Sequence, residues 1–164
     1  MIDGGDFSMG TLIQTVFETQ AAELRMLGYM GYDVTTFGNH EFDYGMARAK
    51  AVIKEADFPY VSCNWVDLRT GLRVLPAVKL FPAGGKWIAF VGITTPESFT
   101  KSTPAYFMNA KQTKYIYDIL GGDDGKKLYD AVQKGIDKAK ALGADVIIGL
   151  GHLGVDPSSS PWTS

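Results

Sequence analysis

Residues 28–43 read Gly-Tyr-Met-Gly-Tyr-Asp-Val-Thr-Thr-Phe-Gly-Asn-His-Glu-Phe-Asp, and this stretch decides how the rest of the chain is interpreted. The β-branched run Val34–Phe37 predicts a short buried strand. Gly38 follows that strand, and a glycine lets the backbone turn sharply and come close to a ligand. The next three residues, Asn39-His40-Glu41, therefore present an amide, an imidazole and a carboxylate at the strand's carboxyl end.

The same order of strand, glycine and polar residue occurs at two other places. Asp6 follows a two-residue strand remnant and two glycines, and His152 follows the apolar run Val146–Leu150 and a glycine. In an open α/β sheet, ligands bind at the edge formed by the carboxyl ends of the strands. Asp, Asn and His side chains suit divalent metals such as Mn or Zn. We therefore expect these side chains to converge on one sheet edge and to hold a metal ion.

The rest of the chain alternates helical patterns with short β-like runs, which predicts a layered α/β fold. Its length of 164 residues suits one domain. The segment from residue 94 to 122 lacks periodicity, so we expect a long surface segment with at most one short helix. The predicted elements are helices at 19–27, 46–56 and 126–142, strands at 60–63 and 146–150, a hairpin of 74–81 with 86–93, and a loop at 157–161.

Composition excludes several classes of protein. With 46% hydrophobic and 21% charged residues the chain can fill a core, which excludes a largely disordered protein. The formal net charge of −2 indicates neither a nucleic-acid partner nor attraction to an anionic membrane. The single cysteine, Cys63, excludes a disulfide framework and a cysteine-rich zinc module, and is interpreted as a core residue. No apolar run approaches the length of a membrane span, and Met1–Gly5 is not a signal peptide.

Each candidate residue also has a simpler interpretation. Asp6 can belong to an ordinary Gly-Asp turn, and His152 can be a surface or hydrogen-bonded core residue. Asn39 can be a helix N-cap, a position that asparagine favours. We interpret Glu41 as structural, and we expect Asn64 to pack near the site.

The hexapeptide Gly38–Asp43 is more specific than its parts. It resembles the Gly-Asn-His-Glu motif of calcineurin-like metallophosphoesterases, and its final Phe-Asp is similar to the branch that contains 5′-nucleotidases, UDP-sugar hydrolases and 2′,3′-cyclic phosphodiesterases. The stretches 3–6, 91–94 and 151–154 are also similar to that branch, in the same order. The resemblance implies a fragment of a four-layer α/β/β/α metallophosphoesterase sandwich, truncated at both ends, with residues 1–164 forming a partial domain.

The resemblance implies roles for five residues. Asp6 matches an aspartate that bridges two divalent metals, and Asn39 and His152 match ligands of one of them. His40 matches the histidine that stabilises the transferring phosphoryl group or protonates the leaving oxygen, and Asp43 the carboxylate that orients it. The chemistry agrees, since two metals clamp the attacking and leaving oxygens and a carboxylate favours an imidazolium. Asp43 can alternatively be an acid that favours a helix N-terminus.

Two of the family's ligand motifs, Asp-x-His and Gly-His-x-His, are absent from these 164 residues. We therefore expect two divalent ions (Mn, Zn, Mg, Ca or Fe) in the parent protein, but at most one weak site and no activity in this chain. The absence of a first strand predicts exposed strand edges and self-association.

The resemblance implies a parent enzyme that hydrolyses phosphate esters of nucleotides or sugar nucleotides with a metal-activated water. It also implies a periplasmic, secreted or cell-surface location. Two alternatives remain: a non-catalytic or binding remnant of the same fold, and a phosphatase or nuclease of that fold with another substrate. The family's substrate domain is absent, so the sequence identifies no substrate-binding residues.

Overall fold

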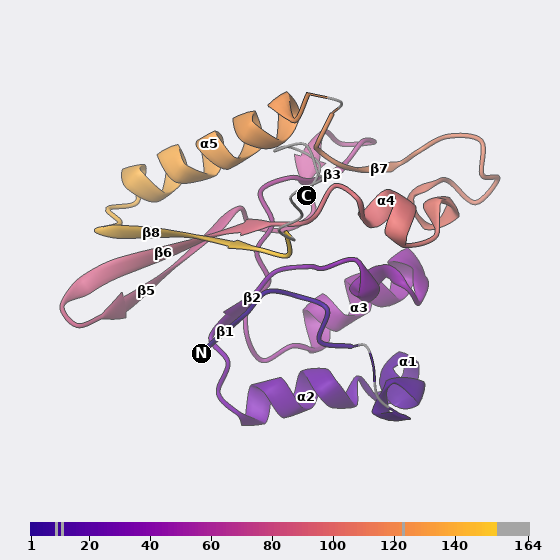
Figure 1. Cartoon of the computed structure of the whole chain (residues 1–164), viewed down its shortest axis with the longest axis horizontal. Helices are drawn as coiled ribbons and strands as arrows, with labels where there is room; N and C mark the ends of the chain where they lie inside the picture. Colours follow the sequence, from indigo (N-terminus) through magenta and orange to yellow (C-terminus); the bar gives the residue numbers. More distant parts are fainter. Residues whose placement is uncertain (9, 11, 123, 154–164) are drawn as a thin grey trace, which may run out of the picture.

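The computed structural model describes residues 1–8, 10, 12–122 and 124–153, and it has the mixed α/β architecture that the sequence predicts (Figure 1). The expected loop at 157–161 lies outside these residues. The helical elements are η1 (Leu12–Val16), α1 (Phe17–Gln20), α2 (Ala22–Tyr29), η2 (His40–Phe42), α3 (Gly45–Glu55), α4 (Ser98–Lys101), η3 (Pro104–Phe107) and α5 (Lys126–Ala141). The strands are β1 (Ile2–Asp3), β2 (Val34–Thr35), β3 (Trp65–Asp67), β4 (Leu72–Arg73), β5 (Val78–Ala83), β6 (Lys86–Ile93), β7 (Tyr117–Ile119) and β8 (Val146–Gly151).

The two N-terminal strands, β1 and β2, pair in parallel, with Ile2 opposite Val34. The prediction of a strand at 60–63 is wrong. The segment forms no regular strand, because its successive N–H groups bond to three different segments. Val61 donates to the carbonyl of Thr35 at 2.9 Å, the next residue donates to Pro76, and Cys63 donates to Gly92 in β6 at 2.7 Å. This segment therefore links the β1–β2 pair to β6 without forming a ladder of its own.

A second sheet has the strand order β5-β6-β8, with β5 antiparallel and β8 parallel to β6. The predicted hairpin around Gly84 and Gly85 is thus confirmed. Figure 1 shows α5 along one face of this sheet, where Val91 packs against the helix. A Cβ on Gly135 of α5 would lie 2.7 Å from Cγ1 of Val91, so glycine permits this close approach. Phe90, the neighbour of Val91, packs on the opposite face with residues of the N-terminal layer.

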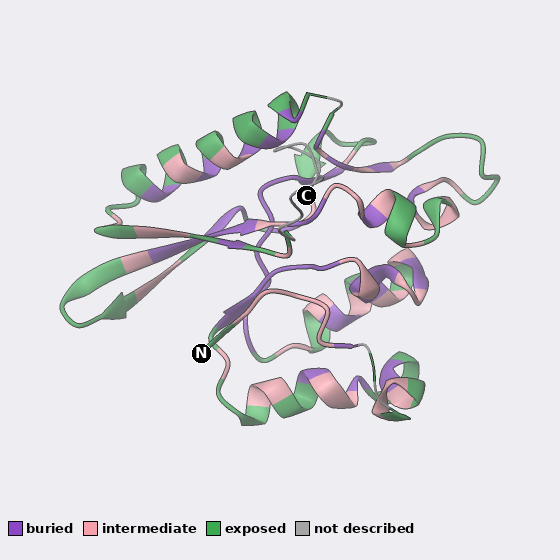
Figure 2. Ribbon diagram, in the orientation of Figure 1, coloured by how far each residue is buried: buried purple, intermediate pink, exposed green. Residues whose placement is uncertain are grey.

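A third sheet, with the order β4-β3-β7, is entirely antiparallel and was not predicted. Its strands have only two or three residues, too few for an alternating pattern to stand out. The segment expected to be irregular, 94–122, contains β7 as well as the short helices α4 and η3. Beside this sheet, rings of Phe37, Phe42, Trp65 and Phe107 pack at centroid distances of 5.0–5.2 Å. Figure 2 shows the resulting buried zone beneath exposed helix faces.

The predicted helix at 19–27 is divided in two by Ala21, whose φ of 44° is left-handed. Helices α3 and α5 agree with their predicted ranges to within one residue at each end. Among the described residues, no helix combines the length and apolar character needed to cross a membrane.

Candidate metal centre

Three turns, each following a strand, meet at one place in the structure. The side chain of Asp6, after β1, lies between the other two turns. Its Oδ1 accepts a hydrogen bond from the backbone N–H of His40 at 2.8 Å, and its Oδ2 lies 2.8 Å from Nε2 of His152, directly after β8. Asn39 precedes His40 in the same turn, and its carbonyl oxygen accepts a hydrogen bond from Oγ of Ser102 at 2.7 Å. The structure therefore brings together Asp6, the turn of Asn39 and His40, and His152. The expected single sheet edge is wrong, however, because β1 and β2 form one sheet and β8 belongs to another.

The first two turns touch backbone to backbone, and glycine makes this contact feasible. A Cβ on Gly5 would lie 2.3 Å from the backbone nitrogen of Gly38, and a Cβ on Gly38 would lie 2.1 Å from Oδ1 of Asp6. Gly5 has a φ of 94° and Asp6 has a φ of 64°. Left-handed conformations are rare for residues with a side chain, and they concentrate at functional sites.

Glu41 lies beneath this contact and is fully buried. Its Oε2 accepts hydrogen bonds from the N–H of Gly38 at 2.7 Å and the N–H of Asp6 at 2.9 Å. Burial raises the pKa of Glu41 to about 7, although these two hydrogen bonds act in the opposite direction. The contacts agree with the structural interpretation of Glu41, but the sequence did not reveal that it joins two separate turns.

His40 and Asp43 form a pair on one side of the short helix η2, three residues apart. Nδ1 of His40 lies 2.6 Å from Oδ2 of Asp43, and both side chains are about three-tenths exposed. Burial lowers the pKa of His40, but the hydrogen bond to Asp43 and the charges of Asp43, Asp6 and Glu41 outweigh it. The net result is a pKa above the ordinary histidine value. The pair can therefore hold a proton that the imidazole donates to an anionic oxygen.

The donors present fit part of a metal site. Two ligands about 2.1 Å from one ion, at angles of 90–110°, lie about 3.0–3.4 Å apart. Oδ2 of Asp6 and Nε2 of His152 lie 2.8 Å apart, so a small increase in this distance would let both atoms bind one ion. In the described part of the chain, however, no group of three or more His, Cys, Asp or Glu side chains is arranged to hold a metal. Another kind of donor could complete such a site, and Asn39 directly precedes His40, whose N–H contacts Asp6.

Other contacts near the site were not foreseen. Asn64 is buried, but it bonds to the backbone of Thr94, at 2.7 and 2.9 Å, and to Leu120 rather than to a candidate site residue. Asp3, in β1, accepts hydrogen bonds on Oδ2 from the N–H of Gly5 at 2.8 Å and the hydroxyl of Thr35 at 2.7 Å. These partners are 30 residues apart or more, except for Asp3 and Gly5, so no local pattern indicates them.

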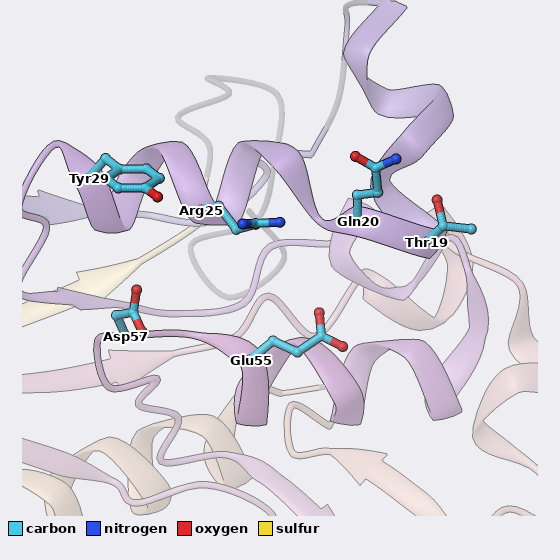
Figure 3. A pocket seen from close by; sticks show the side chains of 6 residues that line it. All are labelled: Thr19, Gln20, Arg25, Tyr29, Glu55 and Asp57. Carbon is cyan, nitrogen blue, oxygen red and sulfur yellow. The ribbon is translucent and has the colours of Figure 1, made fainter.

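A polar hollow lies away from this centre, between helix α2 and the C-terminal end of α3 (Figure 3). One of its acids, Glu55, is held by the guanidinium of Arg48 at 2.7 and 3.0 Å. The described lining includes none of the candidate site residues: it consists of Thr19, Gln20, Arg25, Tyr29, Glu55 and Asp57.

Several characterised proteins are similar to this chain in sequence. Human 5′-nucleotidase is 32% identical over 163 residues, which cover 95% of this chain and 25% of that protein. Protein UshA of Escherichia coli is 28% identical over 154 residues, covering 94% of this chain and 26% of UshA. The chain thus spans about a quarter of the length of these relatives. No protein-family model matches the sequence.

Solved structures share the fold. The 5′-nucleotidase precursor of Thermus thermophilus has a TM-score of 0.74 and 26% identity, over 93% of this chain and 27% of that one. The calcineurin-like phosphoesterase YfkN of Bacillus subtilis has a TM-score of 0.76 and 23% identity, over 99% of this chain and 51% of its own. Sequence and fold together identify the chain as a homologue of part of the calcineurin-like phosphoesterase domain of the 5′-nucleotidase family.

Proposed function

We propose that the parent protein hydrolyses phosphate esters of nucleotides or sugar nucleotides, and that residues 1–164 form part of its metallophosphoesterase domain. The observation that carries this proposal is the position of Asp6, whose two carboxylate oxygens face the N–H of His40 and Nε2 of His152. The names of the relatives support the substrate class. One relative is a snake venom 5′-nucleotidase, which supports a location outside the cytoplasm.

In this proposal Asp6, Asn39 and His152 would hold one divalent ion, and Asp6 would also be a ligand of a second. A bound ion of this kind polarises a phosphoryl oxygen and makes hydroxide available at neutral pH. His40 donates a hydrogen bond to the phosphoryl group or a proton to the leaving oxygen. Asp43 keeps the imidazole oriented and charged, which its 2.6 Å contact and the raised pKa of His40 support.

A second candidate function is a non-catalytic or binding module of the same fold. It is favoured by the lack, among the described residues, of three acidic, histidine or cysteine side chains grouped as metal ligands. The first candidate predicts that the parent protein hydrolyses a phosphate ester and needs a metal ion to do so. The second predicts no hydrolysis.

Activity measurements on the parent protein and on the 164-residue chain, side by side, test the proposal. AMP, UDP-glucose and bis-p-nitrophenyl phosphate serve as substrates with excess Mn²⁺, and metal content is measured in parallel. We expect metal-dependent turnover by the parent, lost in Asp6→Asn and kept in the control Asp57→Asn. We expect at most one weakly bound ion and negligible turnover for the chain. Parent activity that survives both metal removal and Asp6→Asn contradicts the proposal.

We also propose that the 164-residue chain associates with itself through the edge of β1. Among the described strands, β1 pairs only with β2, and Ile2 in β1 is 45% exposed. Open strand edges recruit other chains. Light scattering after size-exclusion chromatography should show dimers or larger species, and a monomer at high concentration contradicts the proposal.

A further inference from the structure

Glu41 lies at the centre of the candidate site although it is not one of the proposed ligands. Its side chain is completely buried, and Oε2 accepts both of its hydrogen bonds, from the N–H of Gly38 and the N–H of Asp6. The other oxygen, Oε1, has no hydrogen-bond partner among the described residues. Burying a carboxylate with one oxygen unpaired is costly, and an apolar residue of similar volume would avoid that cost. The two bonds to Oε2 are therefore the contribution of this side chain that an apolar residue cannot supply.

The bond from Asp6 ties the turn after β1 to the turn after β2, and the bond from Gly38 holds the Glu41 side chain within the second turn. The backbone of Asp6 is left-handed, with a φ of 64°, and such a conformation persists only where its surroundings fix it. The turn containing Glu41 engages Asp6 twice, at its N–H through Glu41 and at Oδ1 through the N–H of His40. The oxygen of Asp6 that remains is Oδ2, which faces His152.

We propose that Glu41 is a positioning residue, which fixes the left-handed backbone of Asp6 and thereby directs Oδ2 of Asp6 towards the position it shares with His152. This inference rests on the proposed function, because it assigns Glu41 to the same metal centre. The role requires an acceptor oxygen in the right place rather than a negative charge. Because a single oxygen accepts both bonds, the carbonyl oxygen of a glutamine can do the same.

Three variants separate this role from a general contribution to the core. Glu41→Gln keeps the size and one acceptor oxygen, whereas Glu41→Leu keeps a similar volume and removes the acceptor. Glu55→Gln is the control, since Glu55 is paired with Arg48 outside the site. If Glu41→Leu does not fold by circular dichroism, Glu41→Asp replaces it, because its shorter side chain cannot reach both N–H groups.

Two measurements on the 164-residue chain test the proposal. Amide hydrogen exchange by NMR reports the N–H groups of Asp6 and Gly38, and Mn²⁺ titration followed by EPR reports ion affinity. In Glu41→Leu we expect both amides to exchange about tenfold faster or more, as for a lost hydrogen bond. We also expect Mn²⁺ affinity to fall roughly 10–100-fold, as for a lost partner of a ligand. Glu41→Gln and Glu55→Gln should stay within about threefold of wild type in both measurements.

Wild-type protection of Asp6 and Gly38 in Glu41→Leu overturns the proposal, as does unchanged Mn²⁺ affinity in that variant. Glu41→Gln behaving like Glu41→Leu also overturns it, because the role would then require the charge. If the wild-type chain binds no Mn²⁺, amide exchange alone decides the role of Glu41, and the metal requirement of the parent protein decides the proposed function separately. Faster exchange in Glu41→Leu but not in Glu41→Gln then supports it, and equal exchange contradicts it.

Discussion

Replacing Gly38 with alanine should disrupt the contact between the first two turns of the site. The new Cβ would lie 2.1 Å from Oδ1 of Asp6 and 2.8 Å from the backbone nitrogen of Asp6. Side-chain carbons essentially never approach other heavy atoms to within 3.0 Å. The carboxylate must therefore move by about 0.9 Å, the difference between this minimum and the 2.1 Å contact. Gly38 does not have a left-handed φ, so the collision alone causes the effect.

The expected cost has two parts. Moving the carboxylate of Asp6 weakens or breaks its hydrogen bond with the N–H of His40, and a bond to a charged group contributes about 1.5–3 kcal/mol. Forcing an additional carbon into a packed position costs about 1–3 kcal/mol. The free energy of unfolding should therefore fall by about 2.5–6 kcal/mol, a large part of the stability of a small domain.

Urea unfolding followed by circular dichroism measures this loss. With a slope near 2 kcal/mol per molar urea, the midpoint should fall by about 2 M. Gly4→Ala is the matched control in the facing turn after β1, because its Cβ would meet only the carbonyl oxygen of Gly151 at an ordinary 3.5 Å. A Gly38→Ala variant within about 1 kcal/mol of wild type would refute the close contact described between the turns.

Three further predictions concern single side chains. His40→Ala in the parent protein should lower kcat roughly 10²–10⁴-fold with metal content unchanged, since His40 is proposed as a proton donor and not a ligand; loss of metal would assign it another role. Burial raises the pKa of the Cys63 thiol to about 11, so Cys63 should react with DTNB at pH 8 only after unfolding in urea, and fast labelling of the native chain contradicts its position. Hydrogen bonds from Arg69 lower the pKa of Asp67 to about 2, below its unfolded value of about 3.9, so the pair stabilises the fold above about pH 4 and loses this effect as the pH falls towards 2. Urea midpoints of wild type and Asp67→Asn should therefore converge over that pH range, and a constant difference argues against the ion pair.

Local chemistry accounts for the parts of the fold that the sequence predicted well. The apolar positions of α5 recur at helical spacing, and Gly84 and Gly85 have positive φ values that suit the hairpin between β5 and β6. The segment 60–63 has the composition of a strand, but its N–H groups bond to three separate segments, and such partners are set by tertiary structure. Strands β3 and β7 are three residues long, and pairing across 50 residues or more rather than local propensity defines them.

The candidate site likewise combines features that the local sequence predicts with contacts that only the tertiary structure sets. Asp6, the turn containing His40, and His152 were placed together from a repeated local context, in which a glycine follows a strand, and the structure agrees. The position of Glu41 between two backbone N–H groups depends on the distance between turns 35 residues apart. The contact of Ser102 with Asn39 joins residues 63 apart, and serine is too common to indicate it.

The metal centre can be tested most directly by diffraction from crystals of the 164-residue chain soaked in MnCl₂, with data collected at the manganese absorption edge. We expect one anomalous peak per chain, between Oδ2 of Asp6 and Nε2 of His152, with the side chain of Asn39 turned towards it. The direct contact between Asp6 and His152, 2.8 Å without the ion, should lengthen as the ion enters. A peak at other residues, or an intact contact between Asp6 and His152 with no peak at saturating Mn²⁺, would contradict the assignment of Asp6, Asn39 and His152 as metal ligands.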